Sequence, residues 1–281
     1  TVGVNIADLR QYQYWSALYN PQAVDYNGLG QQYNSRYTTI TWNNVLGWNY
    51  TFDKHNINLL LGQEMQRKNY FYEYYSGSDF PFAADGKTDL STAGTPQGSE
   101  YYKKEARLAS YFMDAHYSYE DKYYVSGSFR RDGSSRFGKK HRWGTFPSVS
   151  VAWRASQEKW FPKNDYINDL KVRAGYGVTG SQASVGNYSY LASYNTSVYP
   201  FGISSGNQTA LVSSTLANPY IHWEEVAQTN IGFDASLFNS RVMFSFDAYL
   251  KETRDMLVKA SIPITSGFED TTTTYTNAGK V

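Results

Sequence analysis

Apolar and polar residues alternate along most of this chain, which predicts β-strands because successive side chains of a strand point to opposite faces. Val125 and Phe129 fall on one face of such a run, whereas Ser126 and Ser128 fall on the other. A second alternating run covers residues 145–154, after a glycine-rich, charged loop. The two runs predict a β-hairpin with one apolar face and one polar face.

The same period of two recurs along the chain and predicts nine strands, with a tenth that begins at Tyr275. The nine predicted strands cover residues 1–9, 36–52, 55–71, 105–119, 123–130, 145–154, 170–179, 222–238 and 241–258. Long and short connections alternate between them. The long ones are predicted at 13–35, 72–104, 131–144, 180–221 and 259–274. In an up-and-down meander, alternate connections lie at opposite ends, so we expect all the long loops at one end of the sheet.

Strand length and the placement of charge favour a membrane barrel over a soluble β-protein with one solvated face. A tilted strand crosses a membrane in about 9–11 residues, whereas soluble strands are usually about 5–6 residues long. Mid-strand charges such as Lys171, Arg173 and Asp234 fall on the polar face. Arg67 and Arg131 share the apolar parity but lie near the loop end. A cation that faces lipid at the midplane costs roughly 2–4 kcal/mol.

We therefore predict an all-β fold, a transmembrane antiparallel up-and-down β-barrel. A barrel has no free edge, and the chain both starts and stops in mid-alternation. Residues 1–281 are therefore expected to form roughly ten consecutive strands of a larger barrel. No signal peptide opens the sequence, which fits a trimmed mature chain or an internal piece.

Composition agrees with strands and excludes several classes of function. Aromatic residues make up 17% of the 281 residues, with 27 tyrosines, and they fit a pleated, half-buried surface. The net charge of +1 gives no electrostatic case for nucleic acid. There is no cysteine, so disulfides and thiolate metal sites are excluded. The mean hydropathy of −0.58 is compatible with a barrel, in which only every second residue needs to be apolar.

The sequence predicts no catalytic, cofactor or metal site, and we expect a protein that is not an enzyme. No pair of its four histidines has ligand spacing. Glu224 and Glu225 are adjacent, so they would point to opposite faces of a strand and could not act as an acid–base pair. The basic cluster at 136–142 lies in a glycine loop, where a structural or partner-contacting role is favoured over nucleic-acid binding.

Aromatic residues in the predicted long loops are the candidates for contacts with a substrate or with a lid protein. They are Trp15, Tyr19, Phe80, Phe82, Trp143, Tyr194, Tyr199 and Phe201. Aromatic faces can stack against sugars or pack against another protein. The alternative is that these rings pack the loops against each other.

Three blocks of sequence carry a family resemblance. They read FRRDGSSRFG at 129–138 with RWG and FPSVS after it, LKVRAGYGVTG at 170–180, and NP, WE and QTNIG between 218 and 232. Weaker blocks are LLGQE at 60–64 and NAGKV at 277–281. In this order, the blocks resemble the SusC/RagA family of TonB-linked outer-membrane transporters.

The resemblance implies a barrel of about 22 strands with a plugged lumen. It also implies a plug domain and a TonB-engaging segment outside residues 1–281, which would form part of the barrel domain only. The family usually works with a SusD-like surface lipoprotein that caps the extracellular mouth, and its substrates are oligosaccharides or peptides.

The function expected on this basis is active import of glycan or peptide nutrients across the outer membrane of a Gram-negative bacterium. The apolar face would contact outer-membrane lipid, and no cofactor or nucleic acid would take part. A rival hypothesis is a non-transporting surface β-barrel or adhesin whose long loops bind an external ligand. The sequence upstream of Thr1 would discriminate between the two.

Overall fold

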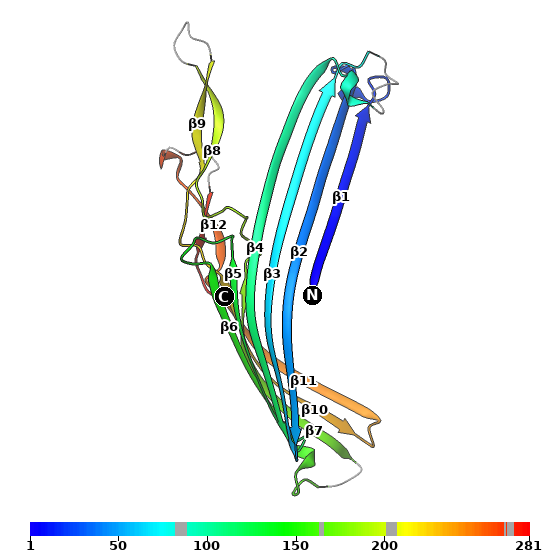
Figure 1. The fold of residues 1–281 in the computed structure, drawn as a ribbon, viewed down its shortest axis with the longest axis vertical. Helices are drawn as coiled ribbons and strands as arrows, with labels where there is room; N and C mark the ends of the chain where they lie inside the picture. Colours follow the sequence, from blue (N-terminus) through cyan, green and yellow to red (C-terminus); the bar gives the residue numbers. More distant parts are fainter. Residues whose placement is uncertain (82–88, 163–165, 201–206, 267, 269–272) are drawn as a thin grey trace. The chain divides into compact units, whose positions relative to one another are not determined.

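The computed structural model describes residues 1–81, 89–162, 166–200, 207–266, 268 and 273–281. Nine strands form one sheet in the order β1-β2-β3-β4-β5-β6-β7-β10-β11 (Figure 1). Their bounds are β1 Val2–Trp15, β2 Leu29–Phe52, β3 His55–Ser78, β4 Thr95–Tyr119, β5 Tyr123–Ser134, β6 Trp143–Arg154, β7 Ile167–Ser181, β10 Glu224–Leu237 and β11 Val242–Arg254. The predicted nine-strand meander is confirmed.

Four shorter strands form two separate ribbons. They are β8 Ser193–Pro200 with β9 Asn207–Thr215, and β12 Leu257–Ser261 with β13 Thr273–Asn277. Helical structure in the described residues is limited to single turns. These are α1 Pro21–Val24 and the 3₁₀ turns η2 Leu90–Thr92, η3 Ala155–Gln157 and η4 Ile264–Ser266. None of these helices is long and apolar enough to cross a membrane.

The chain divides into two compact units. The first comprises residues 1–42 and 65–107, and the second comprises residues 43–64 and 108–281. In the first unit β1 pairs with β2 over its whole length, from Val2 opposite Trp42 to Trp15 opposite Leu29. In the second unit β5 and β6 form the predicted hairpin, with Tyr123 opposite Trp153.

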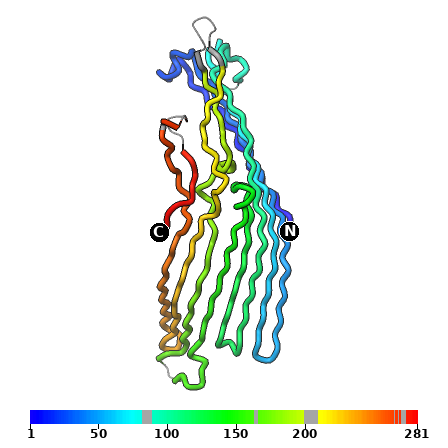
Figure 2. The backbone as a smooth tube through the Cα atoms, turned by 90° about the vertical axis from the view of Figure 1, so that its left-hand side faces the viewer, coloured from blue at the N-terminus to red at the C-terminus, as the bar shows by residue number. Residues whose placement is uncertain are grey.

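The short connections of the second unit lie together at one end of it (Figure 2). A backbone hydrogen bond of 2.9 Å runs from Glu120 N to Lys54 O, which joins the β4–β5 turn to the β2–β3 turn. Arg154 N donates to Lys122 O at 2.7 Å, and Phe238 N donates to Tyr166 O at 3.0 Å. The strict alternation of short and long connections predicted this grouping.

The predicted loops are shorter than expected, because strands continue into them. β3 extends to Ser78 and β4 begins at Thr95. The sequence conceals these extensions, because aromatic and polar residues occur on both faces there and interrupt the period of two. The stretch at 180–221 contains the β8–β9 ribbon. Tyr275 belongs to β13 and pairs with β12, so it does not open the tenth strand. Pairing with β11 begins later, where Val281 exchanges two backbone hydrogen bonds with Thr253.

On β5 and β6 the two faces differ in burial as well as in composition, since most residues of the polar face are buried or half-buried. Large apolar side chains of the strands are exposed in long rows, and Val149 and Phe246 are typical at 50% and 49% exposure. A soluble monomer rarely exposes contiguous apolar patches of this extent. This face therefore requires an apolar environment.

The turn cluster predicts a measurable pH dependence. Hydrogen bonds and ion pairs from Lys122 and Lys54 lower the pKa of the Glu120 carboxyl to about 2, from 4.5. A lowered pKa contributes stability that is present above pH 4.5 and is lost as the pH falls from 4.5 towards 2. The thermal midpoint of the wild-type protein should therefore fall more steeply over this range than that of Glu120→Gln. Asp121→Asn, next in the same turn, is the control and should follow the wild type; equal slopes for all three proteins would contradict the prediction.

Candidate functional site

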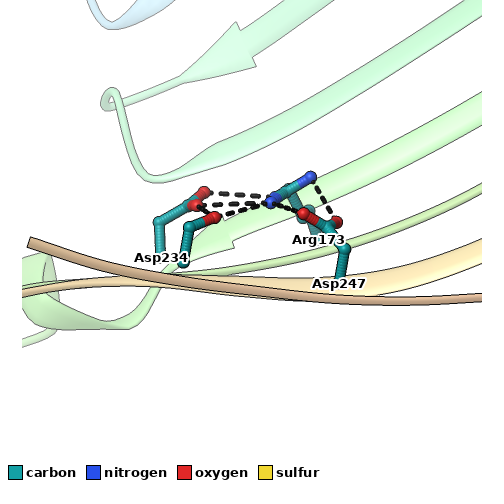
Figure 3. A network of polar contacts seen from close by, with 4 residues as sticks. Arg173, Asp234 and Asp247 are labelled. Carbon is teal, nitrogen blue, oxygen red and sulfur yellow. Dashed lines mark hydrogen bonds and ion pairs between the residues drawn. The ribbon is translucent and has the colours of Figure 1, made fainter.

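A network of charged side chains lies on the polar face of the second unit (Figure 3). Arg173 of β7 donates from Nε to Asp234 Oδ2 of β10 at 3.1 Å. Its Nη1 lies 2.8 Å from Oδ1 of Asp247 on β11. Ser245 Oγ donates to Asp234 Oδ1 at 2.7 Å. One guanidinium thus ties three strands together, and each charge has a partner.

Gly232 makes this reach across β10 possible. Arg173 lies opposite Gly232, and Gly232 lies opposite Asp247, so the cation and the carboxylate meet over a residue without a side chain. A Cβ at Gly232 would lie 2.6 Å from Asp247 Oδ1, 2.7 Å from the carbonyl oxygen of Phe246 and 3.2 Å from the Cζ atom of Arg173. Glycine in a strand often marks such a close approach.

Replacing Gly232 with alanine should therefore force the Arg173–Asp247 pair apart. The expected cost is about 1–3 kcal/mol in the free energy of unfolding, because the added methyl group overpacks the network. Chemical denaturation of the refolded barrel in detergent measures this difference. Gly47→Ala is the matched strand control, since no atom lies within 4 Å of a Cβ there. Equal stability of the two variants would rule out the role assigned to Gly232.

Hydroxyl groups line the same polar face on β5 and β6. Ser126 Oγ and Ser150 Oγ lie 2.5 Å apart, and Ser128 Oγ and Ser148 Oγ lie 2.5 Å apart. The described residues contain no group of three His, Asp or Glu side chains placed to hold a metal ion. The arrangement is a charge-paired surface lined with hydroxyl groups, and it is suited to contact with polar ligands or polar protein segments.

A cluster of six tyrosines lies on the polar face of the first unit, which Gln66 and Lys68 share by strand parity. We call it the tyrosine wall; it consists of Tyr33, Tyr37, Tyr70, Tyr72, Tyr74 and Tyr102. Its residues come from β2, β3 and β4, which are neighbours in the sheet.

Ring stacking fixes the tyrosine wall. The ring centroids of Tyr37 and Tyr70 are 4.2 Å apart, and those of Tyr72 and Tyr102 are 4.9 Å apart. The ammonium group of Lys104 lies 4.4 Å from the centre of the Tyr102 ring. This cation–π contact places an ammonium group, a hydrogen-bond donor, at the wall.

The alternation of apolar and polar residues does not reveal the tyrosine wall, although the sequence carries a signal of it. Tyr70, Tyr72 and Tyr74 recur at the period of a strand, but the apolar–polar pattern predicts a loop from residue 72 onward. Tyrosine also counts as apolar in a simple alternation pattern, which conceals its place on a polar face. The useful signal was an aromatic at every second position, in phase with Gln66 and Lys68.

The long connections of the second unit meet in a buried apolar cluster, which we call the loop knot. It consists of Phe137, Phe146, Val185, Ile221, Trp223 and Leu257. Phe137 is fully buried, and its ring centroid lies 5.2 Å from that of Trp223. This cluster contains most of the buried apolar residues among those described.

Polar side chains of the recognised sequence blocks tie the loop knot together. Arg136 Nη1 donates to the carbonyl oxygens of Gln182 and Val185 at 3.0 and 3.1 Å. The indole N–H of Trp223 donates to Arg142 O at 2.9 Å. Buried carbonyls therefore find donors from distant parts of the chain. The blocks that carry the family resemblance are thus structural, and Arg136 has the predicted loop-structuring role.

Two asparagine side chains also link the segments that form the loop knot. Asn277 Nδ2 donates to His222 O at 3.0 Å, and its Oδ1 accepts from His222 N at 3.0 Å, as a paired backbone would. Asn218 Nδ2 donates to Tyr275 O at 2.7 Å. The weaker block at 277–281 and the block that begins at 218 therefore meet in space.

The candidate loop aromatics of the first unit occupy contrasting positions. Tyr19 is 87% exposed, in the loop after β1. Trp15 is half-buried at the end of β1. Phe80 is only 2% exposed and packs edge-on against Tyr14 at 5.3 Å, so its ring supports the loop from inside.

Two candidates of the second unit have described side chains, Trp143 and Tyr194, and they come from different strands. Trp143 is the first residue of β6, on the apolar face, with the Arg131 guanidinium 5.5 Å from its ring centre. Tyr194 is exposed on β8, which also contains Tyr199. No ring contact joins Trp143 and Tyr194 in the part of the chain described. Phe82 and Phe201 lie outside the described residues.

Antiparallel strands of this length, with one exposed apolar face and one charge-paired polar face, define the wall of a transmembrane β-barrel. The chain matches the model of the TonB dependent receptor-like β-barrel family over residues 2–281, and it belongs to that family.

Named relatives support the SusC/RagA branch. The chain is 36% identical over 236 residues to TonB-dependent receptor P39 of Formosa agariphila, which covers 81% of this chain. It is 29% identical over 251 residues to TonB-dependent receptor SusC of Bacteroides thetaiotaomicron, which covers 80% of this chain. The chain spans only 21% and 24% of these two relatives.

A solved structure agrees with these relatives. The structure of the RagAB peptide transporter superposes with a TM-score of 0.85 at 27% identity, and it covers 99% of this chain and 30% of its own. The predicted resemblance to the SusC/RagA family, as part of a barrel, is confirmed. Proteins of this family are outer-membrane β-barrels that serve nutrient transport.

Proposed function

We propose that this chain forms part of the barrel of a non-enzymatic importer in the outer membrane of a Gram-negative bacterium. The observation that carries the proposal is the two-faced sheet. An exposed apolar face suits lipid, and a polar face with paired charges such as Arg173–Asp234 suits a lumen. The apolar face would contact outer-membrane lipid, and the polar face would line the path of the substrate.

The rest of the protein would supply the moving parts. We propose a plug domain inside the lumen and a segment that engages the TonB complex, both outside residues 1–281. The substrate would be an oligosaccharide or a peptide. Support comes from the relatives, which are TonB-dependent receptors of much greater length than this chain.

We also propose a SusD-like surface lipoprotein as the lid of this importer. The exposed aromatics Tyr19 and Tyr194, together with the β8–β9 ribbon, are candidate contacts for the lid or for substrate. Trp15, Trp143 and Tyr199 remain candidates of the same kind. Co-purification in mild detergent tests the partnership, and recovery of the transporter alone would contradict it.

Uptake that depends on the proton-motive force tests the importer directly. A strain that lacks the gene should fail to grow on one class of glycan or peptide, and the intact gene should restore growth. A protonophore should abolish uptake of that nutrient. If the deletion leaves growth unchanged on every glycan and every peptide tested, the rival function is favoured instead. That function is a surface barrel or adhesin whose loops bind a ligand without transport.

A further inference from the structure

The tyrosine wall is more than a strand-pairing feature, because its rings are held in place before any ligand arrives. Tyr70 lies at its centre, with Tyr37, Tyr72 and Tyr102 around it at centroid distances of 4.2, 6.5 and 5.8 Å. Stacked tyrosines lose little conformational entropy on binding, because they have few rotatable bonds and are already packed. The wall is therefore a rigid surface of aromatic faces with hydroxyl groups at their rims.

Its chemistry fits a carbohydrate. A sugar ring has a flat face of C–H groups and a rim of hydroxyls, and a phenol ring has an electron-rich face and a polar tip. The ammonium group of Lys104, held over the Tyr102 ring, adds a donor for hydroxyl oxygens. Tyr33 Oη donates to Gln31 Oε1 at 2.7 Å, so an amide group also stands beside the rings. Residues 70 to 74 span roughly 13 Å of β3, which suits a chain of sugars better than a single one.

The same surface suits a peptide less well. Peptides commonly bind a sheet by adding a strand at a free edge. β2 lies between β1 and β3, and β3 lies between β2 and β4, so these strands have no free edge.

We propose that the tyrosine wall is a carbohydrate-binding surface, with Tyr37 as its most accessible ring. Tyr37 is 55% exposed and stacks through one face on Tyr70, which leaves its other face for a sugar. This inference rests on the proposed function, since it assigns the class of substrate and one place where the importer holds it.

The test compares two tyrosines of equal exposure on opposite faces. Purified full-length protein is applied to an array of oligosaccharides and to an array of tiled peptides. Tyr37→Ala should weaken oligosaccharide binding roughly five- to tenfold, the loss expected for one aromatic contact. Tyr37→Phe should keep most of the binding. Tyr101→Ala is the matched control, because Tyr101 is 57% exposed and lies on the opposite face of β4; it should bind as the wild type does.

Each contrary outcome is informative. Binding to peptides only, or to neither array, would overturn the assignment of carbohydrate. Oligosaccharide binding unchanged in Tyr37→Ala would overturn the assignment of the wall. Energy-dependent uptake, measured separately in cells, distinguishes these failures from failure of the importer itself, because uptake can persist when the wall is not the binding surface.

Discussion

Replacing Phe137 with alanine is expected to destabilise the loop knot by about 3–5 kcal/mol, the usual cost of truncating a buried phenylalanine. Phe137 is fully buried against Trp223, and its neighbours are held by hydrogen bonds to other loops, so the cavity cannot close easily. Hydrogen exchange of the backbone amides measures the effect. Amides of residues 135–142 and 221–223 should exchange faster, while those of β5 and β6 keep their protection.

The control for this experiment is Tyr220→Ala. Tyr220 precedes the buried Ile221 but is 72% exposed, so its loss should leave exchange in the knot almost unchanged. Equal exchange in Phe137→Ala and wild type would mean that the knot is not a cooperative unit.

Arginine in place of Val149 is expected to cost roughly 2–4 kcal/mol in folding into a bilayer, because Val149 lies mid-strand on the apolar face. The next residue, Ser150, lies on the opposite face beside Ser126. Ser150→Arg should cost far less, since a lumen accepts a cation. Folding titrations into phospholipid vesicles with a chemical denaturant compare the two variants.

The comparison of neighbours makes this prediction specific to the face. Val149 and Ser150 lie on the same strand at nearly the same depth, and both pair with β5 and β7, so the face to which each side chain points is the main difference between the two sites. If arginine costs the same free energy of folding at both positions, the assignment of the apolar face to lipid is wrong.

The regular part of the fold could be predicted from the sequence because alternation is a local property. The hairpin of β5 and β6 has the expected faces, and Arg173, Asp234 and Asp247 lie on the polar face as expected. Their mutual contacts could not be predicted. About 40 residues separate β7 from β10, so the register that places Gly232 between Arg173 and Asp247 depends on long-range pairing.

The loop knot and the tyrosine wall were harder to predict for two different reasons. The knot joins Phe137 to Trp223 and Leu257, and no local pattern shows that such distant residues meet. The blocks were recognisable, but their joint role was not. The tyrosine wall could not be predicted for a chemical reason: Tyr70 and Tyr72 are amphipathic and fit either face of a strand.

We infer that this chain is a barrel wall with its apolar face in lipid and its polar face towards a lumen. Spin labels at Val149→Cys and Ser150→Cys test it most directly, and the absence of cysteine from residues 1–281 leaves the labels unambiguous there. In the full-length protein in lipid bilayers, the label at position 149 should collide mainly with oxygen, which concentrates in lipid. The label at position 150 should show little contact with lipid-dissolved oxygen. Strong collision of the position-149 label with a water-soluble nickel chelate, and none with oxygen, would contradict the account.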